Sequence, residues 1–113
     1  MHELSLMEAT LAIALTQTQA AGASTIHSLE LQVGTLSGIV PEALAFAFDV
    51  ASAGTAAEGA ELRLKTVPTR CYCGDCQQEF QPRDWIYECP HCHRLSTDIC
   101  QGQDLILASL EVS

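Results

Sequence analysis

Four cysteines are spaced so that they could bind one metal ion. They form two C-x-x-C pairs, Cys73 with Cys76 and Cys89 with Cys92. A tight turn of this spacing can point two sulfurs at one cation, and two such turns complete a tetrahedron. Soft thiolates in this array favour zinc, with an iron site of the rubredoxin type as the alternative. Because sulfur would fill every position and leave none open for water or substrate, we predict a structural zinc ion rather than a catalytic one.

Two further cysteines and two histidines lie close to these pairs. Cys71 and Cys73 would share one face of an extended segment, about two strand rises apart, so one turn can hardly use both sulfurs. We therefore expect Cys71 and Cys100 to be free, buried thiols. His91 and His93, in and beside the second turn, are replacement metal ligands, hydrogen-bond donors to the metal-bound sulfurs or exposed turn residues.

The first three residues offer a second, separate set of metal ligands. The α-amine of Met1, with the backbone amide and ring nitrogen of His2, can close a five- and a six-membered chelate ring around one ion. Ni(II) and Cu(II) suit such a nitrogen set, and the Glu3 carboxylate can add an oxygen if the metal becomes octahedral. The alternative is that these residues are only a frayed lead-in to the first helix.

A helix should follow directly after these N-terminal residues and hold them in place. Ser5 and Glu8 match a capping box, which predicts a helix from about Leu6 and leaves Met1 to Glu3 outside it. Gly22 supplies a stop. The apolar residues at the three-four spacing of one buried helical face are Leu4, Met7, Leu11 and Leu15.

The rest of the chain predicts three strands and a second helix. The helix should run from about Pro41 to Ala51, with Leu44 and Phe48 buried and Phe46 as a further candidate for the core. Alternating apolar residues predict the strands. Their inward positions are Leu29, Leu31 and Val33 in the first, Leu62 and Leu64 in the second, and Ile106, Ala108, Leu110 and Val112 in the last.

This order predicts an α+β fold in which two helices lie on a small three-stranded sheet, with an inserted four-cysteine domain resembling a zinc ribbon. We expect residues 1–68 and 101–113 to form the helix-and-sheet domain that carries the terminal ligands. Residues 69–100 should form the inserted zinc-binding domain.

The charge and hydropathy of the chain limit the kinds of partner that it can bind. The 113-residue chain carries 14 acidic and 5 basic residues, a formal charge of −9, with no Lys or Arg between Met1 and Leu62. Such a chain repels phosphate backbones, so we predict no nucleic-acid partner; it favours cations and basic protein surfaces. No signal segment or membrane span is visible, and we expect a cytoplasmic protein whose cysteines stay reduced and bind metal.

Several motifs together resemble one known family. They are the "MHE" start, the segment "LQVGTLSGIVPEAL", the pair Phe48 and Asp49, the strand entry "GAEL" and both C-x-x-C pairs. Over essentially its whole length, the chain resembles hydrogenase maturation proteins of the HypA/HybF type, which are nickel metallochaperones.

The resemblance implies a nickel site at Met1 and His2, with Glu3 as a further ligand, beside a structural zinc site at the four paired cysteines. One departure concerns an acidic nickel ligand that some relatives carry after the first strand. Here Ile39, Val40 and Pro41 occupy that neighbourhood. His93 matches a histidine that relatives carry after the last cysteine, whereas its counterpart after the first pair is absent.

The expected function is therefore that of a carrier and not of an enzyme. The resemblance implies that the protein takes Ni(II) at its terminus, docks on a nickel-handling GTPase of the HypB type and serves the large subunit of a [NiFe] hydrogenase. The alternatives are a zinc-ribbon interaction module without nickel transfer and a rubredoxin-like electron carrier.

Overall fold

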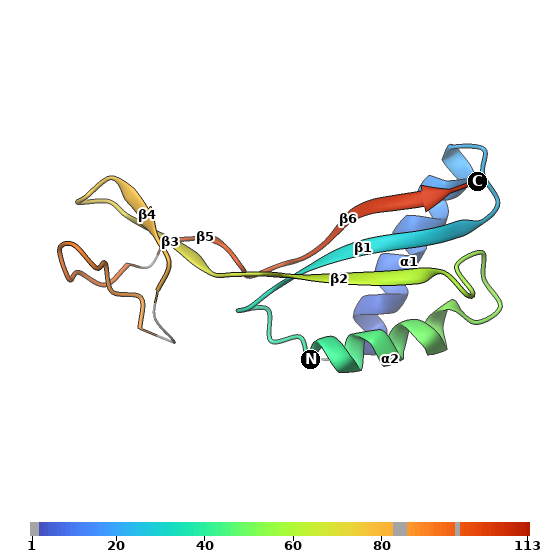
Figure 1. Cartoon of the computed structure of the whole chain (residues 1–113), viewed down its shortest axis with the longest axis horizontal. Coiled ribbons are helices and arrows are strands. Elements are labelled where there is room, and N and C mark those ends of the chain that lie inside the picture. Colours follow the sequence, from blue (N-terminus) through green and yellow to red (C-terminus); the bar gives the residue numbers. More distant parts are fainter. Residues whose placement is uncertain (1–2, 83–85, 97) are drawn as a thin grey trace.

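The molecule contains two small sheets at opposite ends of its long axis. The computed structural model describes residues 3–82, 86–96 and 98–113. Within them the elements are α1 (Glu3–Ala20), β1 (Ile26–Gly34), α2 (Pro41–Ser52), β2 (Glu61–Val67), β3 (Arg70–Cys73), β4 (Gln78–Phe80), β5 (Asp98–Gln101) and β6 (Leu105–Val112). The sheets have the orders β2-β1-β6 and β4-β3-β5, and the molecule measures 53 × 26 × 17 Å (Figure 1). The predicted α+β class is confirmed: two helices accompany a three-stranded sheet, and the four-cysteine segment lies between two of its strands in the chain.

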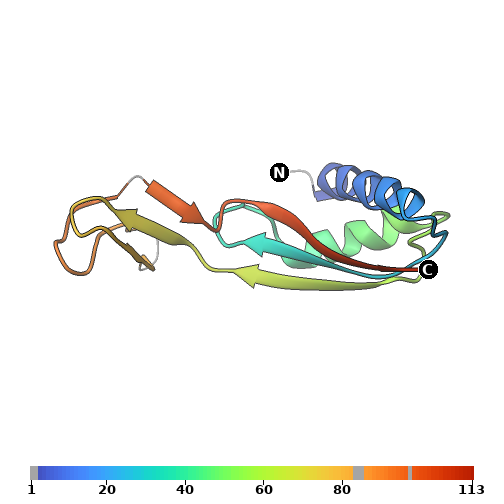
Figure 2. The same cartoon turned by 90° about the horizontal axis from the view of Figure 1, so that it is seen from above.

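The larger sheet carries the main apolar core. Its central strand β1 pairs in parallel with β2 and antiparallel with β6. As the alternation predicted, Leu29, Leu31 and Val33 are buried, and they pack with side chains of both helices. Figure 2 shows α1 stacked along one side of this sheet.

Helix α1 begins earlier than the capping box predicted. It starts at Glu3, so Ser5 lies inside the helix and is not its cap. A carboxylate in the first turn favours this start because it interacts with the positive end of the helix dipole. Leu4 is 43% exposed, since the buried face begins only at Met7, one turn later. The side chains of α1 in the core are Met7, Leu11, Ala14 and Thr18.

The predicted stop at Gly22 is confirmed. Gly22 has a φ of 74°, in the left-handed region that glycine adopts without strain. Its N–H donates to the carbonyl of Gln19, and the N–H of Ala23 donates to the carbonyl of Thr18. This pair of bonds satisfies carbonyls at the end of the helix and turns the chain toward β1.

Helix α2 matches its predicted range to within one residue. One of the side chains predicted for its buried face is exposed. Leu44 and Phe48 are buried as expected, whereas Phe46 is 71% exposed. Phe46 is two residues from both Leu44 and Phe48, so on a helix it points away from them. An aromatic ring therefore lies on the outer face of α2.

The last strand faces the core with different residues from those predicted. Between Glu30 and Leu31 the pairing of β1 with β6 shifts register, and Ala108 is left without an opposite residue. Such a bulge inverts the alternation that follows it. Leu110 and Val112 pack on the core as predicted, but Leu105 and Leu107 replace Ile106 and Ala108, and Ile106 is 48% exposed.

The smaller sheet has a core made largely of sulfur. Strand β3 pairs with β4 and with β5, antiparallel in both cases. Its buried residues are Cys71, Cys73, Phe80 and Cys89. Few apolar side chains are available here, so a bound metal ion would supply most of its stability.

A close backbone crossing joins the two sheets. A Cβ added at Gly34, the last residue of β1, would lie 2.2 Å from the carbonyl oxygen of Gly102. The same oxygen accepts the N–H of Leu36 at 2.7 Å, and the hydroxyls of Thr35 and Thr69 lie 2.6 Å apart. The absence of side chains at the two glycines lets the chain segments meet directly at this junction.

Candidate metal centre

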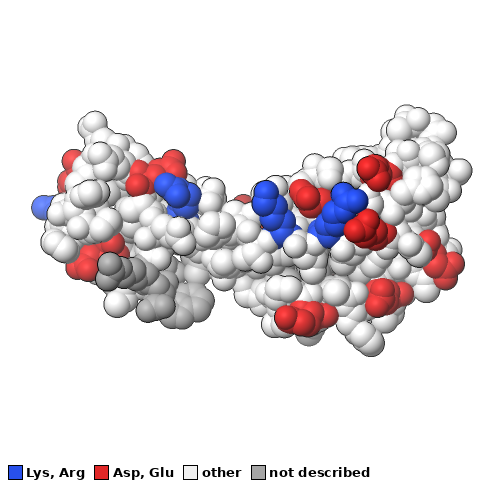
Figure 3. Space-filling view, in the orientation of Figure 1, with Lys and Arg blue, Asp and Glu red and all other residues white. Residues whose placement is uncertain are grey.

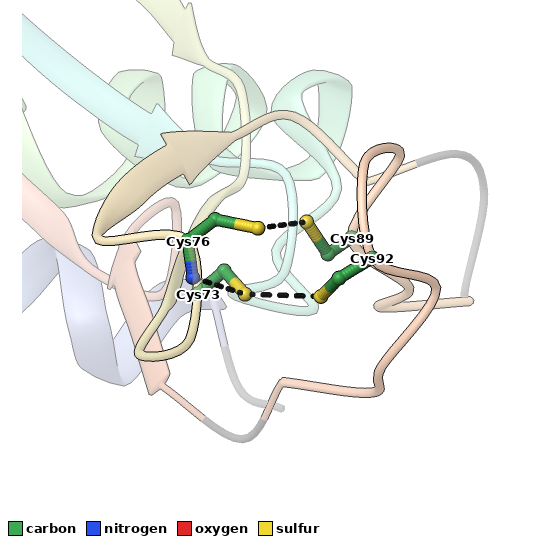
Figure 4. Close-up of side chains that lie close together, drawn as sticks. All are labelled: Cys73, Cys76, Cys89 and Cys92. Atoms are coloured by element: carbon green, nitrogen blue, oxygen red, sulfur yellow. Dashed lines mark hydrogen bonds between the residues drawn. The ribbon is translucent and has the colours of Figure 1, made fainter.

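The four paired cysteines converge as their spacing predicted. The sulfurs of Cys73, Cys76, Cys89 and Cys92 all lie within 4.8 Å of one another. Figure 4 shows them pointing into one space from two turns, with Cys73 Sγ 3.5 Å from Cys92 Sγ and Cys76 Sγ 3.8 Å from Cys89 Sγ. Sulfurs at the corners of a tetrahedron with zinc–sulfur bonds of about 2.3 Å are separated by about 3.8 Å. The donor set and its spacing therefore fit a structural metal ion such as zinc.

Backbone N–H groups donate hydrogen bonds within both turns. In the first, which joins β3 to β4, the N–H of Cys76 donates to Cys73 Sγ at 3.5 Å. In the second, the N–H of His93 donates to the carbonyl of Cys89 at 2.9 Å. The residue after each pair adopts a positive φ, 54° at Gln77 and 64° at His93.

Positive φ is uncommon for residues other than glycine and has an energetic cost. It recurs here at the same place in both turns, directly after the second cysteine of each pair. Neither Gln nor His is typical of a left-handed conformation, so the residue types of Gln77 and His93 do not predict it.

Hydrogen bonds separate the acidities of the thiols. The backbone N–H of Cys92, and then that of His91, lower the pKa of Cys89 to about 6 because they stabilise its thiolate. The neighbouring thiol of Cys92, followed by burial, raises the pKa of Cys76 to about 12. The four thiols cannot all ionise at neutral pH without a counter-charge, which a divalent cation supplies. Metal binding must therefore release protons and weaken as the pH falls.

The histidines beside the second turn lie at the surface. His91 is exposed, and the side chain of His93 is 72% exposed, with its Nδ1 3.8 Å from a carboxylate oxygen of Glu88. This contact gives His93 an acidic neighbour. Whether either imidazole also donates to sulfur stays a prediction.

The two remaining cysteines differ from each other. Cys71 is fully buried, as expected, and burial raises the pKa of its thiol. Cys100 was also expected to be buried, but it is exposed. The reason is its place on β5, an edge strand of the smaller sheet, whose residues other than Ile99 are exposed.

Of the three predicted nickel ligands, only Glu3 lies within the described residues. Met1 and His2 lie outside them. Glu3 begins α1, and its Oε2 accepts a hydrogen bond of 3.3 Å from the backbone N–H of Val40. Val40 directly precedes α2 and provides no side-chain cap for that helix. The carboxylate of Glu3 thus lies where the starts of both helices meet.

No helix in the described part of the chain is long and apolar enough to cross a membrane.

Comparison with known proteins agrees with this architecture. The family model HypA, described as hydrogenase/urease nickel incorporation, metallochaperone, matches residues 1–112. The hydrogenase maturation factor HypA of Picosynechococcus sp. is 46% identical over 112 residues, covering 99% of both chains. The corresponding factor of Roseiflexus sp. is 43% identical and covers 98% of this chain and 91% of its own.

Solved structures show the same fold. The solution structure of the Ni metallochaperone HypA from Helicobacter pylori has a TM-score of 0.75 at 24% identity, covering 99% of this chain and 97% of its own. A second solution structure, of HypA protein, has a TM-score of 0.78 at 25% identity and covers 100% of this chain and 97% of its own.

Proposed function

This chain belongs to the HypA family of hydrogenase/urease nickel-incorporation metallochaperones, and from this premise we propose that it binds Ni(II) at its N-terminus and delivers it during [NiFe] hydrogenase maturation. The ligands are Met1, His2 and Glu3. The observation that carries the proposal is the contact of Glu3 with Val40, which holds the first turn of α1 beside the start of α2.

The first two residues offer nitrogen donors for a metal. The amide of His2 precedes α1, which begins at Glu3, so a metal can replace its proton without breaking a hydrogen bond of that helix. The amine of Met1, a backbone amide and the imidazole of His2 then form chelate rings suited to Ni(II). Glu3 can add an oxygen by giving up its bond to Val40. A set with few protein ligands favours transfer, because the ion can leave one donor at a time.

The cysteine cluster has the complementary task of holding a resident ion. We assign Cys73, Cys76, Cys89 and Cys92 to structural zinc and residues 69–100 to a zinc-binding domain. Residues 1–68 and 101–113 form the nickel-binding domain. The closed sulfur set leaves no coordination position for a substrate, which supports a carrier and not an enzyme.

The partners follow from the same premise. The protein docks on a nickel-handling GTPase of the HypB type and passes the ion to the large subunit of a [NiFe] hydrogenase. None of the six cysteines forms a disulfide, which favours a reducing compartment, and we place the protein in the cytoplasm.

Calorimetric titration of the untagged, zinc-loaded protein with Ni(II) tests the nickel site. His2→Ala should weaken binding by at least about tenfold, or 1.4 kcal/mol, because the substitution removes a chelating nitrogen. His27→Ala is the matched control: this imidazole is exposed, belongs to β1 and contacts Ser113 Oγ at 2.6 Å, so its loss should leave nickel affinity unchanged. Equal affinities of His2→Ala and the parent would refute the site. A chain that retains one zinc and takes up no nickel would instead support a zinc-ribbon interaction module.

A further inference from the structure

The outer face of α2 carries apolar side chains framed by acids. Phe46 and Val50, one helical turn apart, are 71% and 51% exposed. Glu42 lies one turn before Phe46, and Asp49 lies beside Val50; both are exposed. We call these four residues the α2 stripe. Leu44, Ala47 and Phe48 on the opposite side already fill the core, so the stripe has no task in holding this fold together.

The charge around the stripe has a single sign. No Lys or Arg occurs between Met1 and Leu62, so neither helix carries a cationic side chain of either type. The nearest such residues in the chain, Arg63 and Lys65, alternate along β2 with Leu62 and Leu64, which pack on the core. They therefore point to the opposite face of the sheet. In Figure 3 blue side chains lie over the strands, whereas only red and white appear along the edge formed by α2.

This pattern selects among possible occupants of the stripe. A second copy would bring Glu42 and Asp49 against the same acids across a symmetric contact, which like charges disfavour. A basic protein surface with an apolar recess satisfies both features: the recess takes the ring of Phe46, and Lys or Arg side chains around it pair with the acids. Exposed aromatic residues at the centre of such contacts typically contribute most of the affinity.

The stripe also begins beside Glu3, one of the proposed nickel ligands. Glu3 accepts the N–H of Val40, directly before α2, and Glu42 lies in the first turn of that helix. A partner seated on the stripe would therefore lie next to the terminus. This placement suits a protein that exchanges the metal, because the ion would cross a short distance between the two chains.

We propose that the α2 stripe is the docking surface for a nickel-exchanging partner whose complementary surface is apolar and rimmed by Lys and Arg. The proposal rests on the proposed function for the identity of the cargo. It adds the surface, the anchor residue Phe46 and the chemistry of the partner.

The test measures affinity for a purified HypB-type GTPase, the partner proposed above, by calorimetry. Phe46→Ala should weaken binding by at least about tenfold, the loss typical of an aromatic anchor. Val50→Ser should weaken it severalfold. Ile13→Ser is the matched control, because Ile13 is 54% exposed but lies on α1; binding by this variant should match the parent.

A charge-reversal pair tests the electrostatic part. Glu42→Lys combined with Asp49→Lys should weaken binding strongly and reduce its dependence on salt, since both favourable pairs become repulsive. Glu8→Lys reverses one exposed charge on α1 and should change affinity far less.

Three results would overturn the proposal: a parent chain that does not bind the GTPase, equal losses for Val50→Ser and Ile13→Ser, and self-association that Phe46→Ala abolishes. The last result, seen by analytical ultracentrifugation, would assign the stripe to a second copy.

Phe46→Ala should bind Ni(II) as tightly as the parent, and His2→Ala should bind the GTPase as tightly as the parent. Failure of the docking surface is thus separable from failure of the nickel site.

Discussion

The two ends of this molecule are held together by different interactions. The helix-covered sheet buries a continuous apolar cluster that includes Met7, Leu31, Leu44 and Phe48. The smaller sheet buries mainly cysteine, with Phe80 as its one fully enclosed aromatic among the described residues. A core of that size cannot offset the chain entropy of about thirty residues, whereas a structural zinc ion contributes on the order of 10 kcal/mol. One region should therefore fold by exclusion of water, and the other by coordination.

The largest expected effect is the loss of one zinc ligand. In Cys89→Ser the smaller sheet should unfold, because a thiolate buried at the centre of the cluster is replaced by a weaker donor. Elemental analysis should show less than one zinc per chain, and amide exchange should lose protection in residues 69–101 while β1 keeps its own. Cys100→Ser, at an exposed cysteine, should retain zinc and protection. If β1 lost protection together with the smaller sheet, the two regions would not differ as described.

The converse substitution targets the apolar core. Leu31→Ala should lower the free energy of unfolding of the larger sheet by about 2–5 kcal/mol, because Leu31 is fully buried and its removal leaves a cavity. Zinc content should stay at one per chain. Leu4→Ala, at a position that is 43% exposed, should cost far less in chemical denaturation. Equal costs at both positions would show that the core is not where the structure places it.

A substitution at the junction tests how closely the two regions pack against each other. In Gly102→Ala the new Cβ would lie 2.7 Å from the Cα of Thr69, in a residue with a φ of 99°. We expect a loss of about 1–3 kcal/mol, measured by chemical denaturation. Gly54→Ala shares the positive φ, 75°, but meets open space, so the difference between the variants isolates the steric part. Indistinguishable variants would argue against the close crossing.

The smallest effect concerns one hydrogen bond at the same junction. Thr35→Ala removes the contact with the hydroxyl of Thr69 and should cost about 0.5–1.5 kcal/mol. Thr16→Ala is the control, because its exposed hydroxyl only contacts a carbonyl of its own helix. A loss well above this range would mean that the threonine pair fixes the relative placement of the two sheets, and not merely one local contact.

Much of this fold was predictable because local patterns determined it. The alternation of Leu29, Leu31 and Val33 identified β1, and the spacing of the cysteine pairs identified the metal-binding group. Gly22 ended its helix as expected. In each case the physical cause acts over a few neighbouring residues, which the sequence displays directly.

Two of the predictions that failed depend on contacts between segments that are distant in the sequence. The bulge at Ala108 depends on pairing with β1, so alternation alone placed Ile106 in the core. The start of α1 at Glu3 accompanies a contact with Val40 that sequence spacing does not reveal. The failure at Phe46 has a local cause instead: its position on the helix directs it away from Leu44 and Phe48.

The central claim is that the two metals occupy chemically distinct places, nickel at the terminus and zinc in the sulfur cluster. X-ray absorption at the nickel edge, on untagged protein loaded with one zinc and one nickel, tests it most directly. We predict a nickel shell of nitrogen and oxygen only, which is lost when residues are added before Met1. Sulfur in the nickel shell, or a spectrum unchanged by the extension, would contradict the account.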